Sequence, residues 1–424
     1  MSCMKILYVI HQFYPEHRSG TEQFLLQLAT SMQRSGHHAE VLTYNLSSEC
    51  GFEQPGEAIQ VRTYFHDRLL ISAVRHKRVP IDINAEITNP ATLHFAVRFL
   101  KNTACDLVHI AHPMRLASFA LAADQLDIPY VVTLTDFWAI CPKIYLRTSF
   151  DGLCAGPESG RACSRLCPEL TAEFVQRRLQ ASCAMLMRAK AVVAPSRFLA
   201  DVVTREFSAL RIAVVPHGLK LGNGLPNLRT YDRNSSITFA YCGGLSPHKG
   251  VHLLLNAFLS LHAENAKLRI YGAAGINEKD YERKLHDIAA SDPAINFCGT
   301  YERPDVGKVL NGIDVLIIPS LCYETYSFIL HEGIAANIPI IASDIGHLAE
   351  KVRDSYTGWL FPVGDESALG EKLRQVMDNP AILNDIKGRL HDLFCPLEEE
   401  EAFMYERLYR IAISKPQQEV QPAR

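Results

Sequence analysis

Apolar residues along the chain form two kinds of segment, short uninterrupted runs and longer stretches with helical spacing. The short runs are rich in β-branched residues, which is typical of strands buried on both faces of a parallel sheet. They lie at residues 6–10, 39–43, 106–112, 130–134, 191–194, 212–215, 237–241, 268–271, 295–298, 314–320 and 338–342. Helices are predicted between them at residues 21–34, 171–190, 197–207, 251–262 and 328–336. Strands that alternate with helices predict an α/β fold with doubly wound sheets.

This pattern starts twice, which indicates two domains. At 424 residues the chain exceeds what one hydrophobic core usually serves. A stretch with several Gly and Pro residues separates the halves and is the best candidate for a linker. We therefore expect a first Rossmann-like domain at residues 1–216, a linker at 217–236, a second Rossmann-like domain at 237–396, and at 397–424 a helix that returns to the first domain, followed by a disordered tail.

Two carboxylates stand eight residues apart between the predicted strands 314–320 and 338–342, in the sequence YETYSFILHE. Ser327 is a candidate N-cap for the helix that follows, so the preceding backbone amides would form an anion site at the end of a strand. Glu324 and Glu332 would flank that site with acceptors that suit sugar hydroxyls and a ribose. The alternative is that one is a solvated loop charge and the other a helix-surface carboxylate.

A glycine-containing loop, CGGLSPHKG, follows the predicted strand 237–241. Gly243 and Gly244 allow the backbone to approach a phosphate closely, and Lys249 can reach it as a point charge. The loop is not a P-loop, because the Gly-Lys-Ser/Thr ending is absent. Two later strands end near Gly272 and Tyr301 and are expected to open toward the same base-binding edge.

These second-half motifs resemble those of the family 4 retaining glycosyltransferases of the GT-B fold (glycosyl transferases group 1), whose E-x7-E motif Glu324 and Glu332 match. The resemblance implies two Rossmann-like domains facing each other across a cleft, with the donor held mostly by the second and the acceptor mostly by the first. It also implies that Glu324 faces the donor sugar and Glu332 the nucleotide ribose. The diphosphate is then assigned to Lys249 and to the backbone amides of Thr325, Tyr326 and Ser327.

The first half resembles the family more loosely. Residues 13–22 are similar to the family's Gly-Gly loop, although Ser19 replaces the first glycine and only Gly20 remains. The family's His-Asp pair is Thr135 and Asp136 here, so the imidazole that approaches the donor sugar is missing. His112, at the end of a predicted strand, is a candidate for acceptor contact or a satisfied structural histidine. In the second half Gly244 replaces the family's arginine, which leaves Lys249 as the expected single cation on the diphosphate.

Four of the twelve cysteines lie in one polar loop, at Cys141, Cys154, Cys163 and Cys167. Their spacing is compatible with a tetrahedral thiolate site for a structural zinc ion, or with buried free thiols. Neither interpretation involves metal in the chemistry, because four thiolates would leave no open position for a catalytic water.

The composition limits which classes of partner are expected. A net charge of −3 gives no reason to expect nucleic acid, and no apolar run reaches the length of a membrane-spanning helix. We expect a cytoplasmic protein. Residues 68–78 mix apolar and basic side chains, which predicts either a basic amphipathic helix in peripheral contact with the inner face of the membrane or an ordinary surface helix.

The predicted function is transfer of a hexose-type sugar, with retention, from a nucleotide-diphosphate donor to a saccharide or lipid-linked saccharide in cell-surface polysaccharide or glycoconjugate synthesis. Catalytic roles fall to Glu324, Lys249 and Asp136, and no cofactor is required for the chemistry. The acceptor side is assigned to Gly20, His112 and Thr135. The alternatives are a nucleotide-sugar epimerase on the same architecture and a non-catalytic protein that binds nucleotide sugars.

Overall fold

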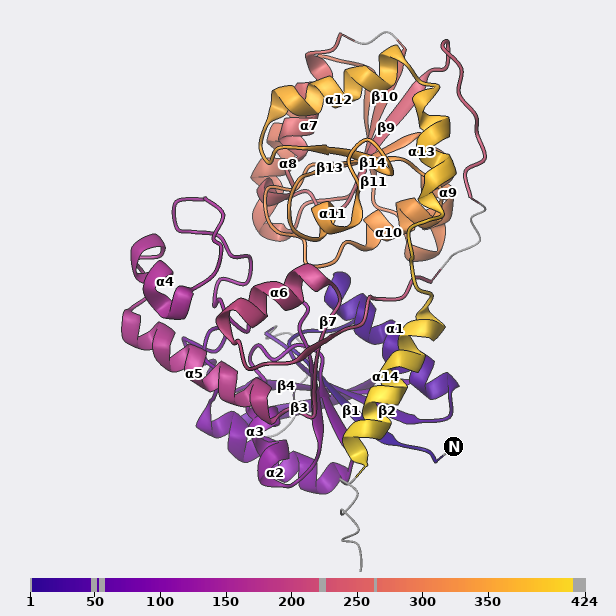
Figure 1. The fold of residues 1–424 in the computed structure, drawn as a ribbon. Coiled ribbons are helices and arrows are strands. Elements are labelled where there is room, and N and C mark those ends of the chain that lie inside the picture. The colour runs from indigo at the N-terminus through magenta and orange to yellow at the C-terminus, as the bar shows by residue number, and fades with distance from the viewer. Residues whose placement is uncertain (1, 47–51, 53–57, 221–225, 263–264, 415–424) are drawn as a thin grey trace, which may run out of the picture. The chain divides into compact units, whose positions relative to one another are not determined.

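A computed structural model describes residues 2–46, 52, 58–220, 226–262 and 265–414. The chain forms two compact units (Figure 1). Unit 1 comprises Met1–Gly218 together with Glu398–Arg424, and unit 2 comprises Leu219–Leu397.

Unit 1 is built on an eight-stranded sheet with the order β3-β4-β2-β1-β5-β6-β7-β8. All neighbouring strands are parallel except β3 and β4, which form an antiparallel hairpin at one edge. The strands are β1 (Lys5–Ile10), β2 (His38–Tyr44), β3 (Ile59–His66), β4 (Leu69–His76), β5 (Leu107–Ile110), β6 (Tyr130–Thr133), β7 (Ala191–Ala194) and β8 (Ile212–Val214). The helices are α1 (Gly20–Arg34), α2 (Pro90–Thr103), α3 (Ser118–Gln125), α4 (Arg161–Leu166), α5 (Ala172–Arg188), α6 (Arg197–Glu206) and α14 (Glu398–Ile413).

The C-terminal helix α14 is part of the unit 1 core. It packs beside α1 (Figure 1) and buries Tyr405 and Tyr409 completely. The Tyr409 hydroxyl lies 2.6 Å from Nδ1 of His109 on β5, and the Tyr405 hydroxyl lies 2.9 Å from the Thr133 hydroxyl on β6. The last helix therefore covers the sheet through buried hydroxyls that all find partners.

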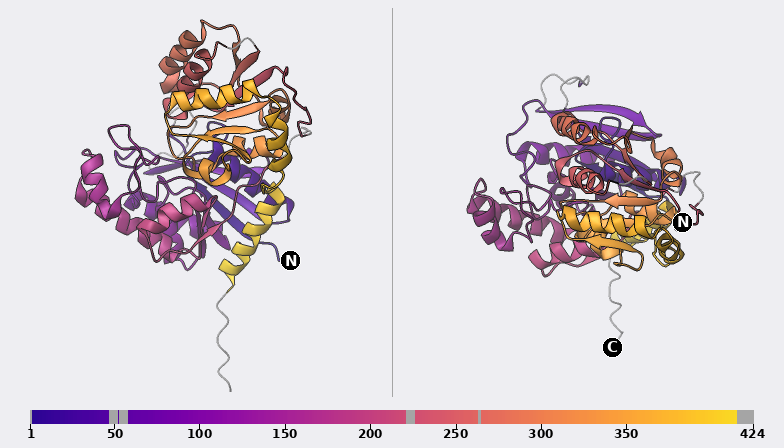
Figure 2. Two further views of the ribbon diagram at one scale, coloured as in Figure 1. Left: turned by 45° about the horizontal axis from the view of Figure 1, so that its top comes forward. Right: turned by 90° about the horizontal axis from the view of Figure 1, so that it is seen from above.

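Unit 2 is built on a six-stranded parallel sheet with the order β11-β10-β9-β12-β13-β14. The strands are β9 (Ile237–Cys242), β10 (Ala266–Tyr271), β11 (Ile295–Gly299), β12 (Val315–Ile318), β13 (Ile340–Ser343) and β14 (Gly358–Phe361). The helices are α7 (Val251–Leu259), α8 (Lys279–Ala289), α9 (Val306–Asn311), α10 (Phe328–Ala335), α11 (Gly346–Lys351), α12 (Glu366–Asp378) and α13 (Ile382–Leu390). Alternate strand residues feed two apolar layers, one under α7, α8 and α12 and one under α9, α10 and α11 (Figures 1 and 2).

Each sheet has a point where the strand order reverses. In unit 1 the chain runs from β1 outward to β2 and later returns to β5 on the other side of β1. In unit 2 it runs from β9 to β10 and β11 and returns to β12. Loops that leave the carboxyl ends of such neighbouring strands diverge, which is where ligands bind in open α/β sheets.

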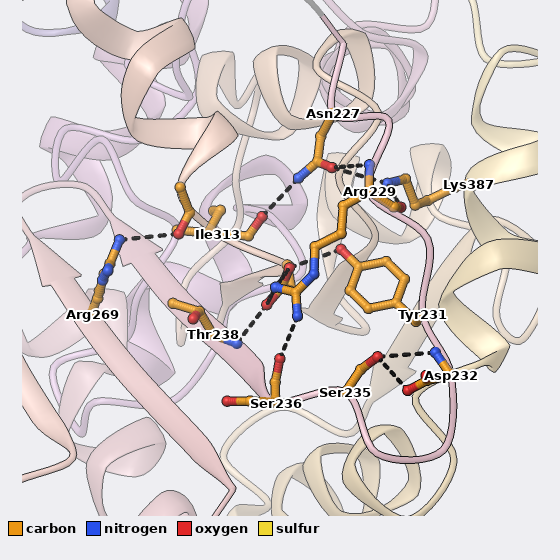
Figure 3. Close-up of polar contacts among 12 residues, drawn as sticks. Asn227, Arg229, Tyr231, Asp232, Ser235, Ser236, Thr238, Arg269, Ile313 and Lys387 are labelled. Atoms are coloured by element: carbon orange, nitrogen blue, oxygen red, sulfur yellow. Dashed lines mark hydrogen bonds and ion pairs between the residues drawn. The ribbon is translucent and has the colours of Figure 1, made fainter.

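The predicted linker, residues 217–236, is only partly described, because residues 221–225 lie outside the described residues. Its last part, residues 226–236, is anchored to unit 2 (Figure 3). The Arg229 guanidinium lies 2.8 and 2.9 Å from the two carboxylate oxygens of buried Asp314, and the Tyr231 hydroxyl donates to the same carboxylate at 2.8 Å. The Lys387 ammonium donates to the Arg229 carbonyl at 2.6 Å.

The α/β prediction of two doubly wound sheets is confirmed, and the helix prediction for residues 68–78 is wrong. That segment contains β4, which pairs with β3 across a turn at Asp67 and Arg68, both with positive φ. Leu69, Ile71 and Ala73 are buried with a spacing of two, so the apolar residues face the core rather than a membrane. Among the described residues no helix is long and apolar enough to cross a membrane. The predicted tail at 416–424 lies outside the described residues.

Candidate active site

The polar residues predicted in the second half gather at the carboxyl edge of the unit 2 sheet, where the strand order reverses. Lys249 ends a short 3-10 turn (Pro247–Lys249) after β9, and Glu324 lies in the loop after the neighbouring β12. Glu332 lies on α10, about one turn from its N-terminus. Sheet topology therefore places residues that are far apart in sequence on one edge.

Lys249 and Glu324 form an ion pair. The Lys249 ammonium donates to Oε1 of Glu324 at 2.6 Å, and the Ser320 hydroxyl donates to the same oxygen at 2.7 Å. Burial alone would raise the pKa of Glu324, but the Lys249 charge and these hydrogen bonds outweigh it and hold the pKa below its usual value. The carboxylate is thus ionised and matched to a cation that a phosphate would also attract.

Glu332 is a buried carboxylate with one satisfied oxygen and one unsatisfied oxygen. Its Oε1 lies 2.5 Å from Nη2 of Arg303, whereas Oε2 is buried without a hydrogen-bond partner in the described part of the chain. The side chain is only 5% exposed. Burial raises the pKa of Glu332, and Arg303 opposes that shift. A buried acceptor without a partner is costly, and a ligand hydroxyl would remove that cost.

Arg303 was not among the predicted site residues. It follows Tyr301 and the end of β11 and therefore reaches the same sheet edge from a strand that is not adjacent to β12. A basic residue shortly after a strand end is the sequence signal that would have found it. The unit 2 site therefore contains a second cation in addition to the predicted Lys249. Arg303 lies next to Glu332.

The loop between the two glutamates is held from several directions. The Ser327 side chain accepts from the Leu330 N–H at 3.4 Å, as predicted for the N-cap of α10. The Tyr326 ring stacks on His331 at 4.2 Å, and the His347 N–H donates to the Glu324 carbonyl at 3.0 Å. These contacts fix the loop backbone. The diphosphate role of the Thr325, Tyr326 and Ser327 amides stays a prediction.

The predicted glycines bring two loops together. Gly272 has a φ of +143°, and a Cβ there would lie 1.8 Å from the carbonyl oxygen of Gly243. The loops after β9 and β10 are thus in direct backbone contact, which only glycine permits. Gly244 is exposed and has open space around it, and Tyr301 is half-buried with its ring edge toward Tyr271.

The acceptor-side candidates of the first half gather at the carboxyl ends of β5 and β6. Nε2 of His112 lies 2.9 Å from Oδ2 of Asp136, and the Met114 N–H donates to Nδ1 at 3.2 Å. Nδ1 is therefore the acceptor nitrogen, and Nε2 carries the proton that it donates to Asp136. The Trp138 N–H donates to the other Asp136 oxygen at 2.7 Å.

The side chains of His112 and Asp136 differ in how exposed they are to solvent. His112 is 1% exposed, whereas the Asp136 side chain is 26% exposed. The more exposed Asp136 is therefore the better placed of the two to meet an acceptor, with His112 holding its carboxylate. The predicted contact of His112 with the acceptor stays a prediction. Thr135, the neighbour of Asp136, is half-buried, and its predicted contact with the acceptor stays a prediction.

Two residues near the start of α1, His11 and Glu22, were not predicted from the sequence. Gly20 is exposed and opens the helix, Ser19 is its N-cap, and the Ser19 N–H donates to Oε2 of Glu22 at 2.7 Å. Oε1 of Glu22 is buried without a hydrogen-bond partner among the described residues and lies 3.9 Å from Nε2 of His11. The Ser-x-x-Glu spacing of a capping box was the available signal. Burial lowers the pKa of His11, whose ring lies tilted against the His112 ring with the centroids 3.9 Å apart.

The four clustered cysteines are all buried, all unpaired as disulfides, and line one small cavity. Within the part of the chain that the structure describes, no three His, Cys, Asp or Glu side chains are arranged to hold a metal ion. The cysteines lie in unit 1, on the segment between β6 and α5.

Two family profiles match the chain. The profile described as "Glycosyltransferase Family 4" matches residues 18–222, and the one described as "Glycosyl transferases group 1" matches residues 236–379. The chain belongs to glycosyltransferase family 4. The first match covers most of unit 1 and the second most of unit 2.

Among relatives of this family 4 protein is the lipopolysaccharide 1,2-N-acetylglucosaminetransferase of Salmonella typhimurium, 28% identical over 221 residues. That alignment covers 47% of this chain and 53% of the relative, so the chain spans about half of the relative's length.

Solved structures share the fold across almost the whole family 4 chain. The Anabaena protein HepE in complex with UDP and glucose matches with a TM-score of 0.65 and 17% identity, covering 95% of this chain and 98% of HepE. A sucrose-phosphate synthase from Thermosynechococcus elongatus matches with a TM-score of 0.69 and 17% identity, covering 96% and 98%. The GT-B fold is confirmed.

Proposed function

We propose that this family 4 protein transfers a hexose-type sugar, with retention, from a nucleotide-diphosphate donor to a saccharide or lipid-linked saccharide. The observation that carries the proposal is the buried, half-satisfied carboxylate of Glu332 beside Arg303. It lies at the same sheet edge as the Lys249–Glu324 ion pair. One acceptor oxygen for a ribose and a cation for a diphosphate are what a nucleoside-diphosphate sugar requires.

Donor binding in this account exchanges partners at the unit 2 site. Oε2 of Glu332 accepts a hydrogen bond from a ribose hydroxyl. The Lys249 ammonium turns from Glu324 to the diphosphate, which carries more negative charge and is also bound by the amides of residues 325–327. Glu324 then accepts hydrogen bonds from hydroxyl groups of the donor sugar.

The chemical step is a displacement at the anomeric carbon. The bond from that carbon to the diphosphate oxygen breaks, and a bond to the acceptor oxygen forms on the same face, which retains the configuration. The acceptor proton passes to the departing phosphate oxygen. Lys249 stabilises the negative charge that develops there, and Asp136 accepts a hydrogen bond from another hydroxyl of the acceptor and so positions the attacking one. No step requires a cofactor.

The named relatives guide the choice of substrates. The Salmonella relative is an N-acetylglucosaminetransferase that acts on lipopolysaccharide, and the HepE structure contains UDP and glucose. Uridine-diphosphate hexoses and N-acetylhexosamines are therefore the first donors to test, with cell-surface saccharides as acceptors. A lipid-linked acceptor would place the protein in peripheral contact with the cytoplasmic face of the membrane.

The proposal is tested by a thermal-shift screen of nucleotide sugars, followed by product analysis with the stabilising donor. Incubation with donor and a saccharide pool should give a glycosylated product, and donor alone should give only slow hydrolysis. A donor converted to its epimer without acceptor would favour a nucleotide-sugar epimerase. Tight donor binding with no product in any pool would favour a non-catalytic binding protein.

A further inference from the structure

The segment between β6 and α5 has little regular structure and an unusual backbone. In residues 141–167 the structure contains only the 3-10 turn Glu158–Gly160 and the short helix α4. Five non-glycine residues there have a positive φ, namely Ile144, Leu146, Asp151, Glu158 and Ser159. For β-branched Ile144, with a φ of 58°, this conformation is strained. Strain of this kind persists only where the surroundings hold the backbone in place.

The four cysteines of this segment share one enclosed space. Cys141, Cys154, Cys163 and Cys167 are between 6% and 9% exposed and line a cavity of about 10 Å³. Aliphatic side chains such as Leu146 supply much of the remaining wall. A cavity of this size has room for about one water-sized occupant. It therefore suits a single ion.

We propose that these four thiolates bind one structural Zn²⁺ ion that holds the segment in its strained conformation. Four sulfur ligands around a single ion are typical of closed zinc sites. The described residues hold no ready-made metal geometry, so the sulfur atoms must move closer together as the ion binds. Each thiol releases its proton when it becomes a ligand.

The site would support residues beside the acceptor-side carboxylate. Cys141 lies three residues after Trp138, whose N–H holds Asp136. Arg178 of α5 donates to the Trp138 carbonyl, and Ser182 donates to the Ala139 carbonyl at 2.6 Å. Zinc bound at Cys141 would therefore hold the segment that directly follows the Trp138 and Ala139 carbonyls. The inference stands on the cysteines and does not depend on the proposed glycosyl transfer.

The test is metal analysis of the full chain purified without chelator. We expect about one zinc per chain, and treatment with a strong chelator should remove it and lower the melting temperature. Substitution with Co²⁺ should give the sulfur-to-cobalt charge-transfer absorption of a tetrahedral thiolate site. Each of these measurements is independent of donor, acceptor and activity.

Single-cysteine variants test whether these four thiols are the zinc ligands. Cys163→Ser should lose the zinc, whereas Cys105→Ser should keep it, because Cys105 is an equally buried thiol of unit 1 outside the cavity. If Cys163→Ser does not fold, the wild-type metal content and the cobalt spectrum decide. Wild-type protein that is metal-free and melts at the same temperature with and without chelator would overturn the proposal. Disulfides among the four cysteines in the metal-free chain would overturn it as well.

Discussion

Lys249 and Glu324 lie 2.6 Å apart, so a diphosphate placed at this edge competes with Glu324 for the same ammonium. The pair keeps a buried carboxylate ionised and keeps the cation oriented toward the strand ends. Arg303 pairs with Glu332 in the same way, although there burial outweighs the cation and the pKa of Glu332 stays raised. Each carboxylate of the motif thus has its own cation, and the two cations belong to different parts of the proposed ligand.

Lys249→Ala should cut kcat by roughly a hundredfold or more, the scale of losing one preorganised electrostatic donor. The loss should exceed the change in donor affinity, because charge on the diphosphate grows as the glycosidic bond breaks. Lys249→Arg should restore only part of the rate, since the planar guanidinium has a different geometry. Steady-state kinetics measure this, with Lys279→Ala on exposed α8 as the control. A kcat near wild type in Lys249→Ala would mean that another group carries the diphosphate.

Arg303→Ala should weaken binding of nucleoside diphosphate by about tenfold, a loss of about 1.4 kcal/mol that lies within the range for a charged hydrogen-bond partner. Burial already raises the pKa of Glu332, and removal of Arg303 raises it further. The ionised form of Glu332 is therefore lost at a higher pH than in the wild type, and the defect should grow as the pH falls. Calorimetry at about pH 6 and about pH 8 measures this against the control Arg374→Ala. A defect of equal size at both pH values would exclude the link to Glu332 ionisation.

At the scale of elements, the buried carboxylate of Asp314 joins residues 226–236 to the unit 2 sheet. Asp314 accepts from Arg229, from Tyr231 and, at 2.8 Å, from the Thr238 N–H at the start of the β9 strand (Figure 3). These bonds join the last part of the predicted linker to β9 and to the residue before β12. The contact therefore orients both strands that lead to the proposed donor site.

Asp314→Ala should lower the free energy of unfolding of unit 2 by about 2 to 4 kcal/mol, because it removes a charged acceptor and leaves buried donors unpaired. Thermal and denaturant unfolding followed by circular dichroism measure the change. The control is Asp305→Ala, which removes a more exposed carboxylate paired with a neighbouring lysine on the surface. Equal stability of the Asp314 and Asp305 variants would show that the anchor contributes little.

Elements with a simple hydrophobic period could be predicted from the sequence. The buried strands of both sheets and the Ser327 cap followed from apolar runs and capping residues. The β3–β4 hairpin did not, because basic residues on β4 imitate the polar face of a helix, and its turn at Asp67 and Arg68 lacks the usual glycine. Arg303 was missed for another reason. Which strand ends lie together depends on the strand order, and a sequence does not state that order.

At the scale of the whole molecule, the account assigns separate tasks to the two units. In the proposed function, unit 2 binds the donor through Lys249, Glu324 and Glu332, and unit 1 presents Asp136 to the acceptor. The family matches cover residues 18–222 and 236–379, and the shared fold covers 95% of the chain, whereas donor, acceptor and stereochemistry belong to the proposal. This division predicts that changes in unit 1 leave nucleotide affinity intact.

Asp136→Asn should lower kcat for transfer by about tenfold or more while the Kd for nucleoside diphosphate stays within about twofold of wild type. The reason is that the carboxylate meets the acceptor hydroxyl and not the nucleotide. His112→Gln should show a weaker form of the same defect, since it changes only the orientation of Asp136. Transfer kinetics and calorimetry on the same preparations separate the two effects. A parallel loss of nucleotide affinity would contradict the division of tasks.

The central claim is that Glu332 and its neighbours bind a nucleoside diphosphate, and calorimetric titration of UDP, ADP and GDP into wild type and Glu332→Ala tests it most directly. We predict that at least one nucleotide binds the wild type, and that Glu332→Ala loses about 1 to 3 kcal/mol of that binding while the fold stays intact. The control variant Glu366→Ala, which removes a carboxylate at the start of α12, should bind like the wild type. Unchanged affinity in Glu332→Ala would contradict the account.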